Sequence, residues 1–360
     1  MADSGPLVDH LNLIVEPTIG RPLGELDIIG GATLKRGAAT IDVRFPVPGE
    51  PHEHLIEAVT VGVRAFEGVR SVTIDAHLMD DEAASAVMER LQASIRKVGG
   101  QGSRTQVIAV SSGKGGVGKS SLTVNLAVAL ANRGRQVGIL DADVWGFSIP
   151  GMLGSSQTPP VFAGAIIPPI LHGVKVISMD FFIPSDQAVI WRGPMLHKAL
   201  DQFLSDVFWD DPDFLLIDMP PGTGDIAISI SQYLPKARQL LVTTPQPTAQ
   251  RVAKRAALMA AKVNQDVIGV VENMSWFTAD DGTRYYLFGE GGGADLADDL
   301  NVDLLAQIPL VPAMREGADE GLPVSIVAPG SDAALAFELL ADEIEARKPR
   351  IRTHPDLVIG

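Results

Sequence analysis

From residue 106 onward, the sequence alternates short, continuous apolar runs with longer stretches of helical periodicity. The apolar runs occupy residues 107–110, 137–140, 214–217, 240–242 and 267–271. Strands that are apolar on both faces are typical of a parallel sheet covered by helices, because neither face of such a sheet meets water. The pattern therefore predicts an α/β fold with a mostly parallel sheet flanked by helices. The expected helices cover residues 119–132, 196–207, 247–263 and 332–346.

The first hundred residues have a different rhythm. Residues 39–45 and 69–76 alternate apolar and polar side chains, as half-buried strands of one sheet do, and a stretch of helical periodicity follows each of them. A glycine-rich stretch without periodicity comes next, which is typical of a linker. The predicted organisation is a small α+β domain over 5–97, a linker over 98–105, the larger α/β domain over 106–346 and a tail over 347–360.

A glycine-rich loop lies between the first apolar run of the larger domain and its first expected helix. It fits the pattern G-x-x-x-x-G-K-[ST] with the residues Gly113, Lys114, Gly115, Gly116, Val117, Gly118, Lys119 and Ser120. Glycines let successive backbone N–H groups turn toward anionic oxygens, and the N-terminus of the following helix adds a positive dipole. In such a loop Lys119 neutralises the β and γ phosphates of a nucleotide, and the Ser120 hydroxyl is a ligand of Mg²⁺.

Three carboxylates stand at the ends of apolar runs that are expected to be parallel strands. Asp141 and Asp143 follow the run 137–140, and Asp218 follows the run 214–217. The carboxyl ends of parallel strands meet at one edge of the sheet, which is also the edge where the phosphate loop opens. Asp218 has the form of the aspartate that holds a Mg²⁺-bound water, and either Asp141 or Asp143 is placed to orient an attacking water. We therefore expect the site to hydrolyse the nucleotide.

Charge and cysteine content argue against several functions. The chain has 29 Lys and Arg against 44 Asp and Glu, and its net charge of −15 argues against a nucleic-acid partner. It has no cysteine, which excludes disulfides, thiolate metal sites and Cys-ligated iron–sulfur clusters. No apolar run approaches the ~20 residues of a membrane span, and residues 1–10 contain no signal core. We expect a cytoplasmic protein without a membrane partner.

Several motifs of the larger domain occur together in one known family. Residues 113–120, with the additional lysine Lys114, resemble the deviant Walker A loop of the MinD, ParA and nitrogenase iron-protein class, and residues 141–154 (DADVWGFSIPGMLG) narrow the resemblance to the Mrp/ApbC group. Further matching segments are 191–195 (WRGPM), 216–225 (LIDMPPGTGD), 242–246 (VTTPQ), 272–275 (ENMS) and 289–293 (GEGGG). The first domain resembles more weakly the small α+β domain that is often fused in front of Mrp proteins.

The resemblance implies an ATP-binding and ATP-hydrolysing homodimer. It implies that Lys114 reaches the phosphates bound by the opposite subunit and that Asp143 positions the hydrolytic water. It also implies that Asp141 and Asp218 support Mg²⁺ through water. The base would be contacted by Asn273, at the edge of the adenine, and by Pro309, which lies near it.

The same family carries iron–sulfur clusters to apo-proteins, on a Cys-x-x-Cys pair that each subunit supplies shortly after the Asn-Met-Ser motif. Residues 274–286 contain no cysteine here, and Glu50 stands close to the position of a loop cysteine that is usual in the small domain. We expect Asp280 and Asp281 to form an exposed turn, because carboxylates do not suit the soft irons of a cluster. The resemblance therefore implies apo-proteins or iron–sulfur assembly factors as partners, whereas direct cluster binding by this chain is not expected.

Two other classes of protein share the phosphate loop. A ParA- or MinD-like ATP-dependent positioning switch needs a basic face for DNA or an amphipathic C-terminal helix for a membrane, and residues 347–360 contain two prolines and no apolar stripe. A P-loop kinase for a small molecule normally has an arginine-rich lid, and a lysine at position 114 is not its pattern. An Mrp-type ATPase is the first expectation, and the positioning switch is the alternative.

Overall fold

A computed structural model describes residues 5–16, 19–45, 52–94, 98–100, 102–143, 146, 148–155, 158–162, 165–182, 193–222 and 224–347. The chain divides into two compact units, which are described separately. The first takes in residues 1–97, 157–170 and 202–210, and the second takes in 98–156, 171–201 and 211–360. No helix in the described part of the chain is both long enough and apolar enough to cross a membrane.

The first unit is a small sheet covered by helices. Its elements are α1 (Gly5–Asn12), β1 (Ile29–Lys35), β2 (Ala38–Phe45), α2 (His52–Ala65), β3 (Ser71–Leu78) and α3 (Asp81–Ser94), followed later in the chain by β6 (Val161–Phe162) and β7 (Ala165–Ile166). The central strand β2 pairs antiparallel with β1 and parallel with β3, so the two strands expected from sequence are neighbours in one sheet. Ile41 and Val43 are buried because the apolar side chains of β2 alternate toward the core.

Two segments of the later chain belong to this first unit. Ile167 and Phe208 are buried in its core, together with residues of α1 and α2. By residue order both segments fall within the predicted larger domain, because residue order alone does not show where an apolar side chain is buried. The main-chain N–H of Phe208 donates to the carbonyl of Ile166 at 2.9 Å, which ties the two added segments to each other.

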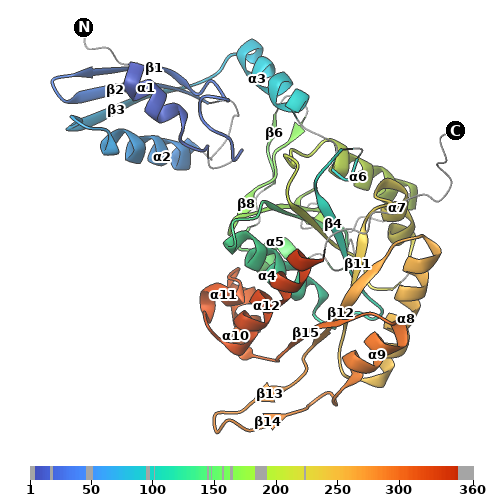
Figure 1. Cartoon of the computed structure of the whole chain (residues 1–360). Helices are drawn as coiled ribbons and strands as arrows, with labels where there is room; N and C mark the ends of the chain where they lie inside the picture. Colours follow the sequence, from blue (N-terminus) through green and yellow to red (C-terminus); the bar gives the residue numbers. More distant parts are fainter. Residues whose placement is uncertain are drawn as a thin grey trace, which may run out of the picture. The chain divides into compact units, whose positions relative to one another are not determined.

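The second unit is built on an eight-stranded sheet with the order β15-β12-β11-β4-β10-β5-β9-β8, and its strands pair in parallel from β15 to β9 (Figure 1). The strands are β4 (Gln106–Ser112), β5 (Val137–Asp141), β8 (Ile170–Leu171), β9 (Val174–Ser178), β10 (Phe214–Asp218), β11 (Arg238–Thr243), β12 (Val267–Asn273) and β15 (Leu304–Ile308). A separate hairpin is formed by β13 (Phe277–Thr278) and β14 (Arg284–Tyr285). The mostly parallel sheet expected from sequence is confirmed.

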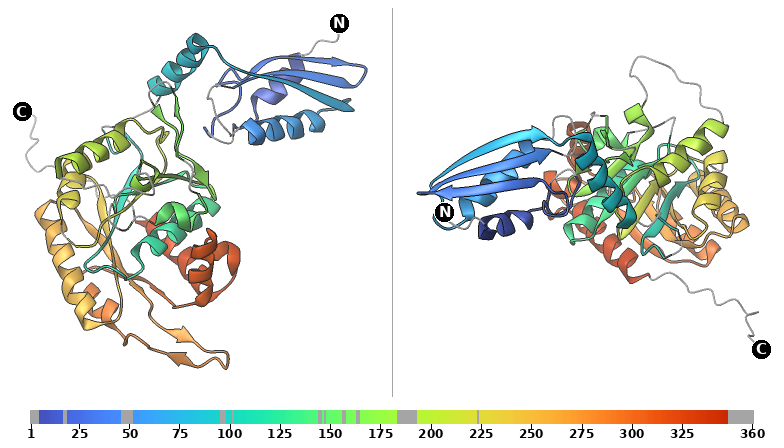
Figure 2. Two further views of the ribbon diagram at one scale, coloured as in Figure 1. Left: turned by 180° about the vertical axis from the view of Figure 1, so that it is seen from behind. Right: turned by 90° about the horizontal axis from the view of Figure 1, so that it is seen from above.

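Helices cover both faces of this sheet. They are α4 (Lys119–Asn132), α5 (Ile149–Met152), the 3₁₀ helix η1 (Met179–Phe182), α6 (Gly193–Ser205), α7 (Asp225–Tyr233), α8 (Pro247–Lys262), α9 (Gly292–Leu300), α10 (Pro312–Glu320), α11 (Val324–Val327) and α12 (Asp332–Ala346). Along β11, Leu240 and Val242 enter the core shared with α4 and α12, whereas Leu241 enters the core shared with α8 and α9. Further views of the ribbon show the helices around this sheet (Figure 2). A strand with a continuous apolar run therefore packs side chains into a core on each face of the sheet.

The helix boundaries expected from sequence are largely confirmed. The bounds of α4 and α12 coincide with the expectation, and α12 begins after Ser331, whose side chain accepts a hydrogen bond from the Ala334 N–H at 3.2 Å. Helix α8 ends one residue earlier than expected, and α6 begins and ends a few residues earlier. The helices α7, α9 and α10, of nine residues each, are too short to give a clear periodic signal. Of the expected tail, residues 348–360 lie outside the described part.

Candidate functional site

The sheet order brings the three strand-end carboxylates and the glycine-rich loop to one place. Strand β10 lies between β4 and β5, and the register sets Asp218 opposite Val110 on one side and Asp141 on the other. Because all three strands are parallel, their carboxyl ends point to the same edge. Residues that are about 100 positions apart in sequence therefore meet at the loop that follows β4.

The glycine-rich loop has a backbone that only glycine adopts readily at two points. Gly116 and Gly118 have φ angles of 79° and 80°, in the left-handed region, and Gly118 directly precedes α4. At Gly113 the restriction is space, because a Cβ there would collide with the backbone of Val252 in α8. The loop is thus fixed by its conformation and by close contact with a neighbouring helix.

Lys119, the first residue of α4, is buried and faces the carboxylates. Its side chain is 6% exposed, and its Nζ lies 2.7 Å from Asp218 Oδ2 and 3.8 Å from Asp143 Oδ2. The Ser120 Oγ is 3.3 Å from the same Nζ. The lysine that the sequence assigns to phosphate binding is therefore paired with the carboxylate of the neighbouring strand in this structure.

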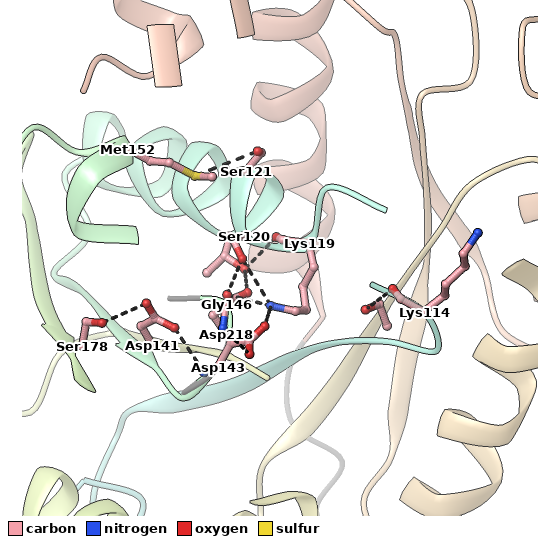
Figure 3. A network of polar contacts seen from close by, with 12 residues as sticks. Lys114, Lys119, Ser120, Ser121, Asp141, Asp143, Gly146, Met152, Ser178 and Asp218 are labelled. Atoms are coloured by element: carbon pink, nitrogen blue, oxygen red, sulfur yellow. Dashed lines mark hydrogen bonds and ion pairs between the residues drawn. The ribbon is translucent and has the colours of Figure 1, made fainter. Parts of the chain in front are cut away.

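Asp218 is fully buried, and its two oxygens have different partners. Oδ2 accepts hydrogen bonds from Ser120 Oγ at 2.6 Å and from Lys119 Nζ. Oδ1 accepts a hydrogen bond from Thr123 Oγ1 at 2.9 Å. Each of these donors is on the first turns of α4, so the helix and the strand are joined through one carboxylate. Figure 3 shows Lys119 and Ser120 beside Asp218.

Asp141 is buried beside Asp218, and among the described residues its hydrogen-bond donors are the Ser178 hydroxyl and the Asp143 N–H. Burial raises the pKa of the Asp141 carboxyl to about 7, and the neighbouring charge of Asp218 raises it as well. A hydrogen bond of 2.9 Å from Ser178 Oγ to Asp141 Oδ2, and another of 3.2 Å from the Asp143 N–H to Oδ1, lower the pKa. The balance of these effects favours the protonated, neutral form of Asp141 beside the charge of Asp218.

Asp143 lies at the boundary between this buried cluster and an open cavity. Its side chain is 10% exposed, and its Oδ1 accepts a hydrogen bond from the Gly146 N–H at 3.1 Å. The cavity has a volume of about 370 Å³. It is lined by Ser112, Gly115, Gly116, Gly118, Lys119, Ser120, Ser121, Asp143, Gly146, Ser148, Met152 and Pro221. Of the three acidic residues, Asp143 is thus the one that lines the cavity, a distinction that residue spacing alone left open.

Lys114 differs from the rest of the loop. Its side chain is exposed and points away from Lys119 and the aspartates of its own chain (Figure 3). The carbonyl of Lys114 accepts a hydrogen bond from Ser112 Oγ at 3.1 Å, so its main chain is held while its ammonium group extends outward. Within one chain, Lys114 therefore does not join the cluster.

Asn273 and Pro309 both lie at the carboxyl edge of the sheet. The Asn273 side chain ends β12, is 4% exposed and donates from Nδ2 to the carbonyl of Val117 in the loop at 2.9 Å. Pro309 is buried directly after β15, where the adjoining main chain bonds to residues 275–276. Contact of either residue with a base stays a prediction, although Asn273 has a defined role in bracing the loop.

Residues 274–286, where the resembling family has its cysteines, form a turn and a short hairpin. The Arg284 guanidinium carbon lies 4.6 Å from the centre of the Trp276 ring. Asp281 Oδ1 accepts a hydrogen bond from the Thr283 N–H at 2.9 Å, and this bond holds the pKa of the Asp281 carboxyl below its ordinary value. Within the described ranges, no group of three or more His, Cys, Asp or Glu side chains is arranged to hold a metal ion. The expected Asp-Asp-Gly turn is confirmed.

Two residues of the cluster were not predicted from sequence. Thr123 lies one helical turn after Lys119, so the spacing of four residues was a signal that it shares the same face of α4. Ser178 ends β9, whose five residues (VKVIS) include a lysine. This strand therefore lacks the continuous apolar run that marks the other strands of the site in the sequence. Both are fully buried and both donate to a carboxylate of the site.

The parallel sheet, the glycine-rich loop opening at its carboxyl edge and the buried lysine facing strand-end carboxylates define a P-loop NTPase. Solved structures agree with this class. A nucleotide-binding protein from Archaeoglobus fulgidus, in complex with ADP, is 35% identical with a TM-score of 0.57, over 69% of this chain and 96% of that one. The cell division ATPase MinD of Pyrococcus furiosus is 30% identical with a TM-score of 0.52, over 67% of this chain and 98% of that one.

Within this class, the chain belongs to the ParA family of NUBPL-type iron-transfer P-loop NTPases, whose family model matches residues 103–345. Proteins named iron-sulfur cluster carrier protein are similar over most of their length. The one from Mycobacterium tuberculosis is 43% identical over 350 residues, which are 94% of this chain and 92% of the relative. The one from Bacillus subtilis is 41% identical over 298 residues, which are 82% and 84% of the two chains. The expected Mrp/ApbC resemblance is confirmed, and ATP hydrolysis is the activity of this NTPase class.

Proposed function

We propose that this protein binds Mg-ATP in the cavity beside the glycine-rich loop and hydrolyses it. The observation that carries the proposal is the buried contact between Lys119, Ser120 and Asp218 at the end of that loop. The phosphate oxygens would accept hydrogen bonds from the Lys119 ammonium and from the backbone N–H groups of the loop. The cavity, at about 370 Å³, leaves room for a phosphate chain next to these groups.

The donor set fits a magnesium ion. Asp143 and Asp218 pair with the Lys119 ammonium, Asp141 ends the strand beside Asp218, and the Ser120 hydroxyl adjoins Asp218. Carboxylate and hydroxyl oxygens are the ligands that Mg²⁺ takes in proteins, and the phosphates of a bound nucleotide would complete the set. Ser120 would hold the ion directly, and Asp141 and Asp218 would hold it through water. When bound, Mg²⁺ supplies positive charge that neutralises the phosphates.

Asp143 is the residue that we assign to positioning the attacking water. It lines the cavity, and the Gly146 N–H holds its carboxylate in place at 3.1 Å. Phosphoryl transfer is accelerated mainly by position and charge, so a fixed carboxylate that orients water is the contribution this residue type makes.

The outward direction of Lys114 supports a site completed by two chains. The lysine is exposed and points away from Lys119 and the aspartates of its own chain, so its charge would be available to phosphates bound by a second copy (Figure 3). The proposed active form is therefore an ATP-dependent homodimer. In it, Lys114 of each chain would add charge at the nucleotide of the other.

The role of cluster carrier cannot apply to this chain in the form that its relatives' names suggest, because the residues present do not fit an iron–sulfur cluster. The relatives are named as cluster carriers, but this chain has no cysteine at any position. The irons of a cluster are held by cysteine thiolates, and the carboxylates of the Asp280–Asp281 turn cannot replace them. We propose a cytoplasmic ATPase that serves iron–sulfur protein assembly through apo-proteins or assembly factors that hold the cluster themselves. The MinD structures support the alternative positioning switch at lower identity.

One experiment separates the two parts of this proposal. The purified chain is incubated anaerobically with iron and sulfide, with the M. tuberculosis relative as positive control, and cluster content is followed by absorption spectroscopy and metal counting. We expect Mg-ATP hydrolysis without a stable stoichiometric cluster. A chain that retains a cluster overturns the claim that partners must hold it, and a chain that neither binds nor hydrolyses ATP overturns the ATPase assignment.

A further inference from the structure

Thr123 makes a contact with Asp218 that the phosphate-loop pattern does not include. Its Oγ1 lies 2.9 Å from Asp218 Oδ1 and 3.0 Å from the carbonyl oxygen of Lys119. The hydroxyl has one proton, and a bond to an ionised carboxylate is stronger than one to a neutral carbonyl. The proton therefore belongs to the bond with Asp218. Both side chains are fully buried, so water does not compete for this bond.

The other oxygen of Asp218, Oδ2, contacts the two residues that are expected to bind the nucleotide and its metal ion. Lys119 and Ser120 both contact Oδ2 in this structure, and both are the residues assigned above to phosphate and Mg²⁺. When these two turn to the ligand, the described contacts leave Asp218 with Thr123 as its side-chain donor. The carboxylate can rotate about its last bond unless that donor holds one oxygen.

We propose that Thr123 is a positioning residue, which fixes the rotation of the Asp218 carboxylate so that Oδ2 faces the Mg²⁺ site after Lys119 and Ser120 have moved to the nucleotide. This inference rests on the function proposed above. Thr123 touches neither the nucleotide nor the ion. It acts through Asp218, and it stands on α4 one turn after Lys119, so the helix that carries the loop also aligns the carboxylate of the adjoining strand.

The test compares Thr123→Val, which replaces the hydroxyl by a methyl group of similar size, with Thr123→Ser, which keeps the hydroxyl. Binding of a fluorescent ATP analogue is titrated with Mg²⁺ present and with EDTA, and ATP turnover is measured against Mg²⁺ concentration. For Thr123→Val we expect about a tenfold rise in the Mg²⁺ concentration for half-maximal turnover and a similar loss of Mg²⁺-dependent affinity, because one charge-assisted hydrogen bond is removed. Affinity in EDTA stays unchanged, and Thr123→Ser restores the wild-type Mg²⁺ dependence.

A second substitution controls for loss of a buried hydroxyl in general. Thr243 is 1% exposed at the end of β11, and its Oγ1 donates to the neighbouring Thr244 carbonyl at 3.2 Å. Thr243→Val should leave the Mg²⁺ dependence at the wild-type value, and urea unfolding shows whether each variant is folded.

The possible results distinguish failure of the Thr123 role from failure of the proposed function. An unchanged Mg²⁺ dependence in folded Thr123→Val overturns the positioning role, and so does an equal loss of affinity with Mg²⁺ and with EDTA, which indicates general damage to the loop. A wild-type chain that fails to bind Mg-ATP is a failure of the proposed function instead. If Thr123→Val does not fold, Thr123→Ser and Thr123→Ala take its place, and equal Mg²⁺ dependence in those two overturns the inference.

Discussion

Lys119 Nζ lies 2.7 Å from Asp218 Oδ2, and both side chains are buried. The cation of the phosphate loop is thus paired with a carboxylate of the strand beside it. A nucleotide must take Lys119 from this partner, and a divalent cation beside Asp218 would compensate the carboxylate that is left. Under the proposed function, the pair would therefore link nucleotide binding to metal binding in this site.

Substitution of Lys119 tests the phosphate site. Lys119→Ala should weaken binding of ATP by about 100-fold or more, since it removes a buried charge opposed to the phosphates. Titration calorimetry in Mg²⁺ measures the affinity. The exposed Lys236→Ala removes the same charge elsewhere and should bind ATP normally. If Lys119→Ala binds as tightly as the wild type, the phosphates are held by other residues.

Asp143→Ala should separate binding from hydrolysis. The carboxylate faces the cavity without pairing as closely to Lys119 as Asp218 does, so ATP affinity should change less than about threefold while turnover falls about 100-fold. Phosphate release under saturating ATP measures turnover, and Asp143→Asn serves as the matched variant that keeps size and removes charge. If both variants turn over ATP at the wild-type rate, a residue other than Asp143 positions the water.

Lys114→Ala should affect assembly more than folding. The side chain is exposed and points away from its own cluster, so the free energy of unfolding should stay within about 0.5 kcal/mol of the wild type. Sedimentation velocity should show an ATP-dependent dimer for the wild type and a weaker one for Lys114→Ala. Identical sedimentation of the two proteins with ATP would contradict a site shared between chains.

Titration of Asp141 should make the free energy of unfolding depend on pH. Its pKa is raised to about 7 in the folded chain, so the folded state keeps a proton that the unfolded state has already lost between about pH 4 and about pH 7. The contribution of this group to stability therefore falls as pH rises through that window and is constant above it. Glu345, whose pKa is lowered, contributes in the opposite direction, as stability is lost when the pH falls.

Comparison with Asp141→Asn isolates this contribution. Urea unfolding without nucleotide or metal, at several values from about pH 5 to about pH 8, gives the free energy of unfolding of each protein. Relative to the wild type, Asp141→Asn should gain stability as the pH rises toward about 7. A constant difference across the whole range would show that Asp141 titrates normally in the folded chain.

Local sequence determined the elements of the nucleotide site. The glycines of the loop, the lysine after them and the helix from residue 119 follow from short-range constraints on backbone conformation and periodicity, and the structure places them as expected. The absence of cysteine is also fixed by sequence, and no fold can restore a thiolate cluster site to this chain.

Tertiary structure decided which residues meet. The order β4-β10-β5 sets Asp218 beside Asp141, and this order depends on long-range packing that residue spacing does not encode. The same packing made Asp143 the residue that faces the cavity, buried Asp141 and brought Thr123 to Asp218. Burial also sets the charge state of Asp141, because the cost of an ion in a low-dielectric interior is a property of its surroundings and cannot be read from neighbouring residues in the chain.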